Sequence, residues 1–132
     1  MSKIFIIGLP RTGTTSISVV LLELGLSVAH TAFTKRTFEV SDAISDAPCF
    51  SDYQLLDGLF PNAKFIYLTR SMEKWLPSIT MLLEKMAPHL EPKTGRFNPI
   101  LKRSFHQTFS SILPLTHSTL IDCYERHQQA VF

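Results

Sequence analysis

Short apolar runs alternate with amphipathic stretches along this chain. Residues 3–7 form an apolar run rich in isoleucine and residues 64–69 form a second one, and such runs are typical of buried parallel strands. A shorter strand is expected over residues 27–30. Between the strands expected over residues 3–7 and 27–30, apolar residues recur at i, i+3, i+4 and i+7. This spacing predicts a helix over residues 14–24 that ends at Gly25.

Helical patterns also fill most of the remaining sequence. Pro77 removes a backbone donor, so the helix after residue 69 is expected to have a kink or a late start near Ser78. The other predicted segments are a helix over residues 35–44 with Thr34 as N-cap, a helix over residues 53–60, a helix capped by Ser71, a loop over residues 88–97, a helix from Asn98-Pro99 to about Ile112, and a last helix from about Thr116.

Strands that alternate with helices are typical of a parallel sheet with helical crossovers. We therefore expect an α/β fold with a three-layer parallel sheet flanked by helices and a mostly helical C-terminal part. The length of 132 residues predicts a single domain over residues 1–132. Ligands of such sheets bind beyond the carboxyl ends of the strands, where the loops after Ile7 and Thr69 lie.

Composition narrows the classes of function. The chain is 45% hydrophobic and 18% charged, so it can bury a core, and its net charge of +2 is too small for bulk electrostatic binding of nucleic acid. Cys49 and Cys123 have no zinc-type spacing, and the histidines lack metal-ligand spacing with a carboxylate or thiol. The apolar start is too short for a signal peptide or a membrane span, so we expect a cytoplasmic protein without metal or membrane partners.

The turn after the first strand has the spacing of a phosphate-binding loop. Gly8 and Gly13 frame four residues in a GxxxxG pattern, which lets successive amides and a helix N-terminus point at one anion. Thr14 stands where nucleotide triphosphatases carry a lysine, and Thr15 adds a second hydroxyl. The loop carries a positive side chain at Arg11 instead of that lysine. The ligand is therefore expected to bear phosphate but to be bound differently from ATP or GTP.

These residues resemble the sulfotransferase superfamily. In that family a loop of the form P-[KR]-[ST]-G-T-[ST] follows the first strand, and a later strand ends in an arginine with a serine eight positions on. Here Arg70 ends the strand of residues 64–69 and Ser78 follows at that spacing, so the resemblance spans residues 3 to about 83. The matching loop residues are Pro10, Arg11, Thr12, Gly13, Thr14 and Thr15, followed by Ser16.

The resemblance implies a P-loop-like fold and a PAPS-dependent enzyme (PAPS is 3′-phosphoadenosine 5′-phosphosulfate; PAP is the desulfonated product). The loop of residues 10–16 would hold the phosphosulfate, and Arg70 with Ser78 would hold the 3′-phosphate. Arg11 would stabilise the charge that develops during sulfuryl transfer, without a metal ion. The acceptor would be a hydroxyl or amine of a small molecule or a glycan.

A base must remove the proton of the acceptor, and three residues compete for that role. His30 ends the expected strand of residues 27–30, and histidine is in general the side chain that changes its charge near neutral pH, which suits a base. Its rival explanation is a strand-end histidine that binds a backbone carbonyl. Asp46 and Asp52 are the other two, and Asp52 is also explained as the N-cap of the next helix.

Two other functions stay open at this point. A P-loop small-molecule kinase would use the same loop with ATP, and a non-catalytic module would bind a nucleotide or PAP without transferring a group. The basic glycine-rich segment that many sulfotransferases carry near the C-terminus is not recognisable, and the chain stops at Phe132 within a helix. A truncated sheet is therefore one expectation, and its exposed edge would favour a homodimer.

Overall fold

The computed structural model describes residues 3–91, 93–109 and 116–131, which form two compact units. The first unit ends at Thr69 and the second begins at Arg70. The first contains all the strands found in the described residues, and the second contains helices.

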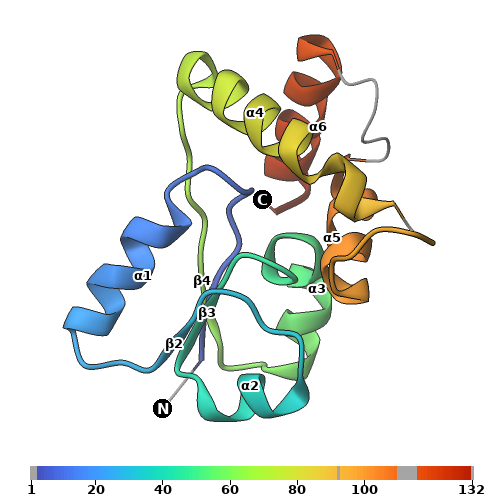
Figure 1. Ribbon diagram of the computed structural model, residues 1–132. Helices are drawn as coiled ribbons and strands as arrows, with labels where there is room; N and C mark the ends of the chain where they lie inside the picture. The colour runs from blue at the N-terminus through green and yellow to red at the C-terminus, as the bar shows by residue number, and fades with distance from the viewer. Residues whose placement is uncertain (1–2, 92, 110–115, 132) are drawn as a thin grey trace. The chain divides into compact units, whose positions relative to one another are not determined.

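The first unit is built on a parallel sheet of four strands, and Figure 1 shows helices on both of its sides. The strand order is β2-β3-β1-β4, so β1 is central and pairs with β3 on one side and with β4 on the other. The predicted parallel α/β sheet is confirmed. The strands are β1 (Ile4–Ile6), β2 (Val28–Ala29), β3 (Ala43–Ser45) and β4 (Lys64–Ile66).

Alternation along β1 gives the sheet two apolar faces. Ile6 packs with Leu21 of α1 (Thr14–Glu23) and with Ala43 of β3, so α1 covers one face. Phe5 points to the opposite face, where its ring lies 6.4 Å from that of Phe38 in α2 (Lys35–Val40) and 5.3 Å from that of Phe60. The helix α3 (Cys49–Leu59) packs on the same strand, which completes the three layers.

The predicted helix over residues 35–44 is wrong in its second half. Thr34 caps the helix as expected, because its side chain accepts from the Thr37 N–H, but α2 ends at Val40. Residues 43–45 instead form β3, between β2 and β1, and all three are fully buried. A strand buried on both faces shows no alternation of polar and apolar positions, so the pattern did not reveal it.

The next helix also begins earlier than expected. α3 starts at Cys49 with Pro48 at the N-cap position. Asp52 lies at a kink with non-helical backbone, φ −107° and ψ 19°, where two helical segments meet, so it directly precedes the segment predicted as a helix over residues 53–60, and its interpretation as the N-cap of that segment stays a prediction. The strand predicted over residues 64–69 is confirmed in its first half, since β4 ends at Ile66.

Within its described residues, the second unit consists of three mutually packed helices, α4 (Met72–Leu90), α5 (Pro99–Phe109) and α6 (His117–Val131). Trp75 of α4 is fully buried, and its ring meets that of Tyr124 of α6 edge-on with centroids 4.9 Å apart. Trp75 is therefore a core residue, as the helical spacing predicted. Asn98 caps α5 as predicted, because its side chain accepts from the Ile100 N–H at 2.9 Å.

Pro77 does not delay the start of α4. The helix begins at Met72 and continues through Pro77 to Leu90, so the loop expected from residue 88 begins only after Leu90. The buried side chains of Trp75 and Ile79 flank the proline, and their packing stabilises the helix on both sides of it.

Two further expectations concern the ends of these helices. Ser71 occupies the N-cap position of α4 without a side-chain capping bond. The predicted end of α5 at Ile112 lies outside the described residues.

A close approach of two chain segments requires glycine at position 8, two residues after the end of β1. A Cβ at this position would lie 2.9 Å from the Leu68 Cβ and 3.0 Å from the Leu68 backbone nitrogen. We expect Gly8→Ala to lower the free energy of unfolding by about 1–3 kcal/mol, because backbone must shift to make room. Urea denaturation followed by circular dichroism measures this change.

Gly58→Ala is the matched control. Gly58 lies in α3, and a Cβ there would meet nothing within 4 Å. Alanine at that helical position should be neutral or stabilising by up to about 1 kcal/mol. Equal stability changes in the two variants would contradict the packing that we assign to Gly8.

Candidate functional site

The loop between β1 and α1 turns sharply through two residues with left-handed backbone. Arg11 has φ 69° and Gly13 has φ 105°. The glycine meets this requirement without strain, whereas Arg11 is an uncommon residue for such a conformation. The buried Thr12 hydroxyl donates to the Leu9 carbonyl at 2.6 Å and closes the turn from inside. Arg11 is exposed at the tip of this loop, and the hydrogen bond between Thr12 and Leu9 stabilises the backbone of the turn.

The N-terminus of α1, which follows this loop, lies at the carboxyl edge of the sheet. Gly13 is the N-cap residue, and its carbonyl accepts the first helical bond, from the Ile17 N–H at 3.1 Å. Helix geometry leaves the amides of residues 14–16 without an intrahelical acceptor, and Gly13 has no side chain that could cap them. This helix end therefore offers backbone donors and a positive dipole end to an anion.

His30 lies at the same edge of the sheet, one residue beyond β2. Its Nδ1 atom is 3.1 Å from the Ser45 Oγ atom, and its Nε2 atom is 3.4 Å from the Asp46 Oδ2 atom. The Ala32 N–H donates to the Ala47 carbonyl at 3.0 Å. This bond holds the segments that follow β2 and β3 side by side. The rival explanation of His30 as a histidine bound to a backbone carbonyl does not describe these contacts.

The network continues from Ser45 into α1. The Ser45 and Ser18 hydroxyl oxygens lie 2.9 Å apart, and the Ser18 hydroxyl donates to the Thr14 carbonyl at 2.7 Å. Both serines are buried, Ser45 completely. Hydrogen bonds thus connect His30 to the first turn of the helix that follows the candidate phosphate loop.

Burial raises the pKa of the Asp46 carboxyl above its ordinary value of 3.8, and the positive charge of protonated His30 partly opposes this. Two of the three candidate bases, His30 and Asp46, therefore form one cluster. Asp52 belongs to a different environment inside α3, where its Oδ1 atom accepts from the Ser51 hydroxyl at 3.2 Å.

Arg70 and Ser78 lie in the second unit. The Arg70 N–H donates to the Tyr124 hydroxyl at 3.2 Å, so the backbone at this position is tied to α6. Ser78 lies half-buried on α4. Their assignment to a 3′-phosphate stays a prediction.

Sequence patterns did not single out Ser18 and Ser45. Ser18 lies in a stretch that shows only helical spacing, and Ser45 lies in the strand that the pattern missed. The one usable signal is the dipeptide Ser45-Asp46, since a polar pair at the end of a buried strand points to the ligand-binding edge of a parallel sheet.

Within residues 3–91, 93–109 and 116–131, no group of three or more histidine, cysteine, aspartate or glutamate side chains is placed to hold a metal ion. In that same part of the chain, no helix is both long enough and apolar enough to cross a membrane.

Comparison with known families gives a match over much of the chain. A family model described as a sulfotransferase domain matches residues 32–132, which is more than half of the chain. The matched segment contains β3, Asp46, β4, Arg70 and the described helices of the second unit, and it begins after the loop and His30. No curated protein matches the chain.

The raised pKa of Asp46 predicts how stability depends on pH. Because its folded-state pKa lies above the unfolded value of 3.8, the stability that Asp46 contributes is complete below 3.8 and is lost as the pH rises through the folded-state pKa. Asp46→Asn should therefore gain stability relative to the wild type as the pH rises from about 3 to 7. Denaturant melts across this range measure the difference.

Asp42, at the other end of β3, provides a control of opposite sign. The Ser27 N–H donates to its carboxylate at 2.9 Å, and this bond lowers the Asp42 pKa below 3.8. Its stabilising effect is present above 3.8 and is lost as the pH falls through the lowered pKa. Asp42→Asn should thus lose stability at neutral pH. The same sign for both variants would contradict the assignment of burial as the dominant influence on Asp46.

Proposed function

The chain belongs to the sulfotransferase domain family, and we propose that it transfers a sulfuryl group from PAPS to a hydroxyl or amine of a small-molecule or glycan acceptor. The observation that carries this proposal is a juxtaposition within the first unit. A loop with anion-binding geometry and a histidine–carboxylate pair share the carboxyl edge of one sheet, joined by the hydroxyls of Ser18 and Ser45.

The loop would hold the phosphosulfate end of PAPS. The amides of residues 14–16 supply donors at a helix N-terminus, the exposed Thr15 and Ser16 lie beside them, and Arg11 supplies a permanent positive charge. During transfer, negative charge builds on the bridging oxygen and on the departing phosphate. Donors fixed in advance stabilise that charge more than they stabilise the ground state. The residues present therefore fit the group that the family implies.

The loop favours this reaction over phosphoryl transfer from ATP. Kinases and nucleotide triphosphatases of this loop type place a lysine on the β- and γ-phosphates, and Thr14 occupies that position here. Thr14 is also buried, and its carbonyl accepts from Ser18. A sulfuryl group attached to a single phosphate does not need that lysine.

Titration calorimetry with PAP, ATP and ADP tests the proposal. We expect PAP to bind without metal and more tightly than either ATP or ADP. Binding of ATP that requires Mg²⁺, together with no binding of PAP, would refute the sulfotransferase assignment and favour a kinase. Incubation with ³⁵S-labelled PAPS and a metabolite extract then separates an enzyme from a binding module, because only the enzyme yields a labelled product.

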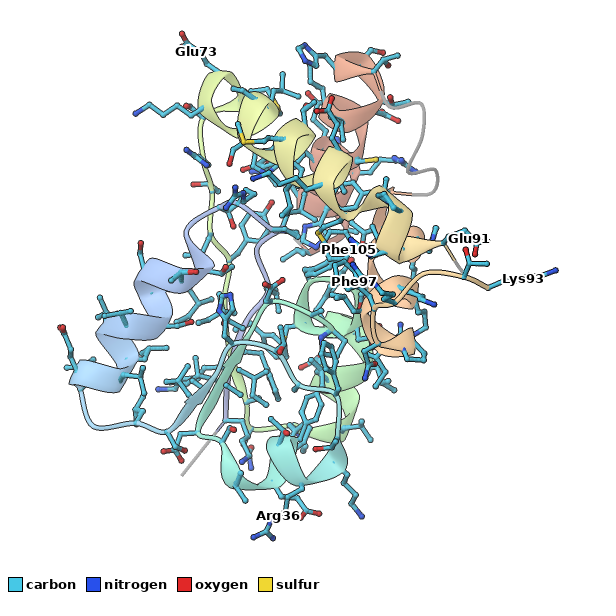
Figure 2. The ribbon with its side chains drawn as sticks, in the orientation of Figure 1. Arg36, Glu73, Glu91, Lys93, Phe97 and Phe105 are labelled. Atoms are coloured by element: carbon cyan, nitrogen blue, oxygen red, sulfur yellow. The ribbon has the colours of Figure 1, made fainter. Side chains whose placement is uncertain are left out.

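Arg11→Ala should lower kcat by about 10²–10³-fold, the cost of removing one donor from a preorganised anion site, about 3–4 kcal/mol. Single-turnover transfer from labelled PAPS measures this loss. Arg36→Ala is the matched control, because Arg36 is an exposed arginine of α2 that extends away from the sheet (Figure 2). If turnover in Arg11→Ala equals that of the control, Arg11 has no part in the reaction.

Arg70→Ala tests the proposed recognition of the 3′-phosphate by Arg70. It removes the guanidinium but keeps the backbone amide that binds Tyr124, so the fold should be preserved. PAP affinity should fall by about 10- to 100-fold, as for the loss of charge-assisted hydrogen bonds, while affinity for AMP, which lacks the 3′-phosphate, should not change. Calorimetry with both nucleotides measures this difference.

Arg126→Ala is the control for this experiment, because it removes an exposed arginine of α6 in the same unit. Equal weakening of PAP and AMP in Arg70→Ala would mean that Arg70 does not recognise the 3′-phosphate.

A further inference from the structure

One acceptor-only group in the hydrogen-bond network around His30 indicates which atom donates at each contact with Ser18 and Ser45. A carbonyl oxygen only accepts, so the Ser18 hydroxyl donates its single hydrogen to Thr14. The contact between Ser18 and Ser45 then requires the hydrogen of Ser45. Both hydroxyls have thereby used their hydrogens, and neither serine has one left for the imidazole.

It follows that His30 donates to Ser45. The Nδ1 atom carries a hydrogen and directs it to the Ser45 Oγ atom at 3.1 Å. A neutral imidazole with its hydrogen on Nδ1 has its lone pair on Nε2. This tautomer is assigned from the acceptor-only carbonyl at the end of the chain of hydrogen bonds.

The Nε2 atom lies near a carboxyl group without a hydrogen bond to it. Asp46 Oδ2 lies 3.4 Å away, and it is the titratable group that the described residues place against the imidazole. The side chain of His30 is 47% exposed, whereas that of Asp46 is 23% exposed. An approaching acceptor therefore reaches the imidazole more readily than the carboxyl.

We propose that Ser45 and Ser18 are positioning residues for His30. They hold the hydrogen of the neutral ring on Nδ1, which makes Nε2 the atom that takes the proton of the acceptor. Asp46 stabilises the imidazolium that this transfer creates. The proposal rests on the proposed function, and it assigns Asp46 to charge stabilisation instead of proton abstraction.

The step balances as follows. The O–H or N–H bond of the acceptor breaks, and its proton forms a bond with His30 Nε2. The acceptor atom forms a bond with sulfur, while the bond between sulfur and the bridging oxygen breaks and leaves its electron pair on the phosphate of PAP. The positive charge gained by His30 is then paired with the Asp46 carboxylate at 3.4 Å.

Nitrogen-15 NMR of the histidine side chains tests the tautomer without any substrate. At a pH where the imidazole is neutral, we expect the wild-type ring to carry its hydrogen on Nδ1, and His30→Gln identifies its signals among the five histidines. Ser45→Ala should shift the ring toward the Nε2–H tautomer, because the acceptor of the Nδ1 hydrogen is gone. Ser41→Ala, which removes another buried serine of the first unit, should leave the tautomer unchanged.

Two results would overturn the proposal. One is an Nε2–H tautomer in the wild type, a measurement that needs no variant to fold. The other is an unchanged Nδ1–H tautomer in Ser45→Ala. Absence of PAP binding would instead refute the proposed function, and the tautomer would still be readable.

The pairing of His30 with Asp46 has its own measurement. In His30→Gln the pKa of the Asp46 carboxyl should rise further, since the opposing positive charge is removed. Carbon-13 NMR titration of the carboxyl groups measures this, and Asp42 should titrate as in the wild type. An unmoved Asp46 would contradict the pairing.

Turnover provides the functional readout. Ser18→Ala should lower kcat by about tenfold, less than the roughly 10²-fold or more expected for loss of the base itself, with PAP affinity unchanged. Ser18→Thr should retain the wild-type rate, because a threonine hydroxyl in a helix can also donate to the carbonyl four residues earlier. A Ser18→Thr variant as slow as Ser18→Ala would show that the hydroxyl is not what matters.

Discussion

The parallel register of three neighbouring strands determines where every group of the first-unit site lies. Ile6 of β1 pairs with Ser45 of β3, and Ala29 of β2 pairs with Ile44 of β3. The residues that follow these pairs therefore leave the sheet at one edge. A shift of one residue in β3 would turn Ser45 to the opposite face, away from α1, and would break its bonds with His30 and Ser18.

Burial and charge act together at this edge. Complete burial of Ser45 means that its hydroxyl must find partners within the protein, and Ser18 and His30 provide them. Partial burial of Asp46 raises its pKa, so the carboxylate gains when a positive charge forms beside it. The same arrangement costs stability at neutral pH, as functional sites commonly do.

The sequence was informative where local chemistry leaves a pattern. The GxxxxG spacing predicted the turn, and the structure explains both glycines, one by close approach to Leu68 and the other by its positive φ. The spacing could not reveal β3, because Ala43, Ile44 and Ser45 are all buried and lack alternation. Without β3 the pairing of His30 with Asp46 was out of reach, and the two appeared as competitors instead of partners.

The chemistry of the loop places the acid–base work on one side of the proposed reaction. Arginine does not release its proton in proteins, so Arg11 would stabilise the departing phosphate by charge alone and could not protonate it. The titratable groups that the described strand ends bring together are His30 and Asp46, which in the proposed reaction would act on the acceptor. A site built in this way makes the reaction depend on pH through the acceptor's proton and not through the leaving group. Replacement of the loop cation by lysine would change that division, because a lysine ammonium can donate a proton as well as a charge.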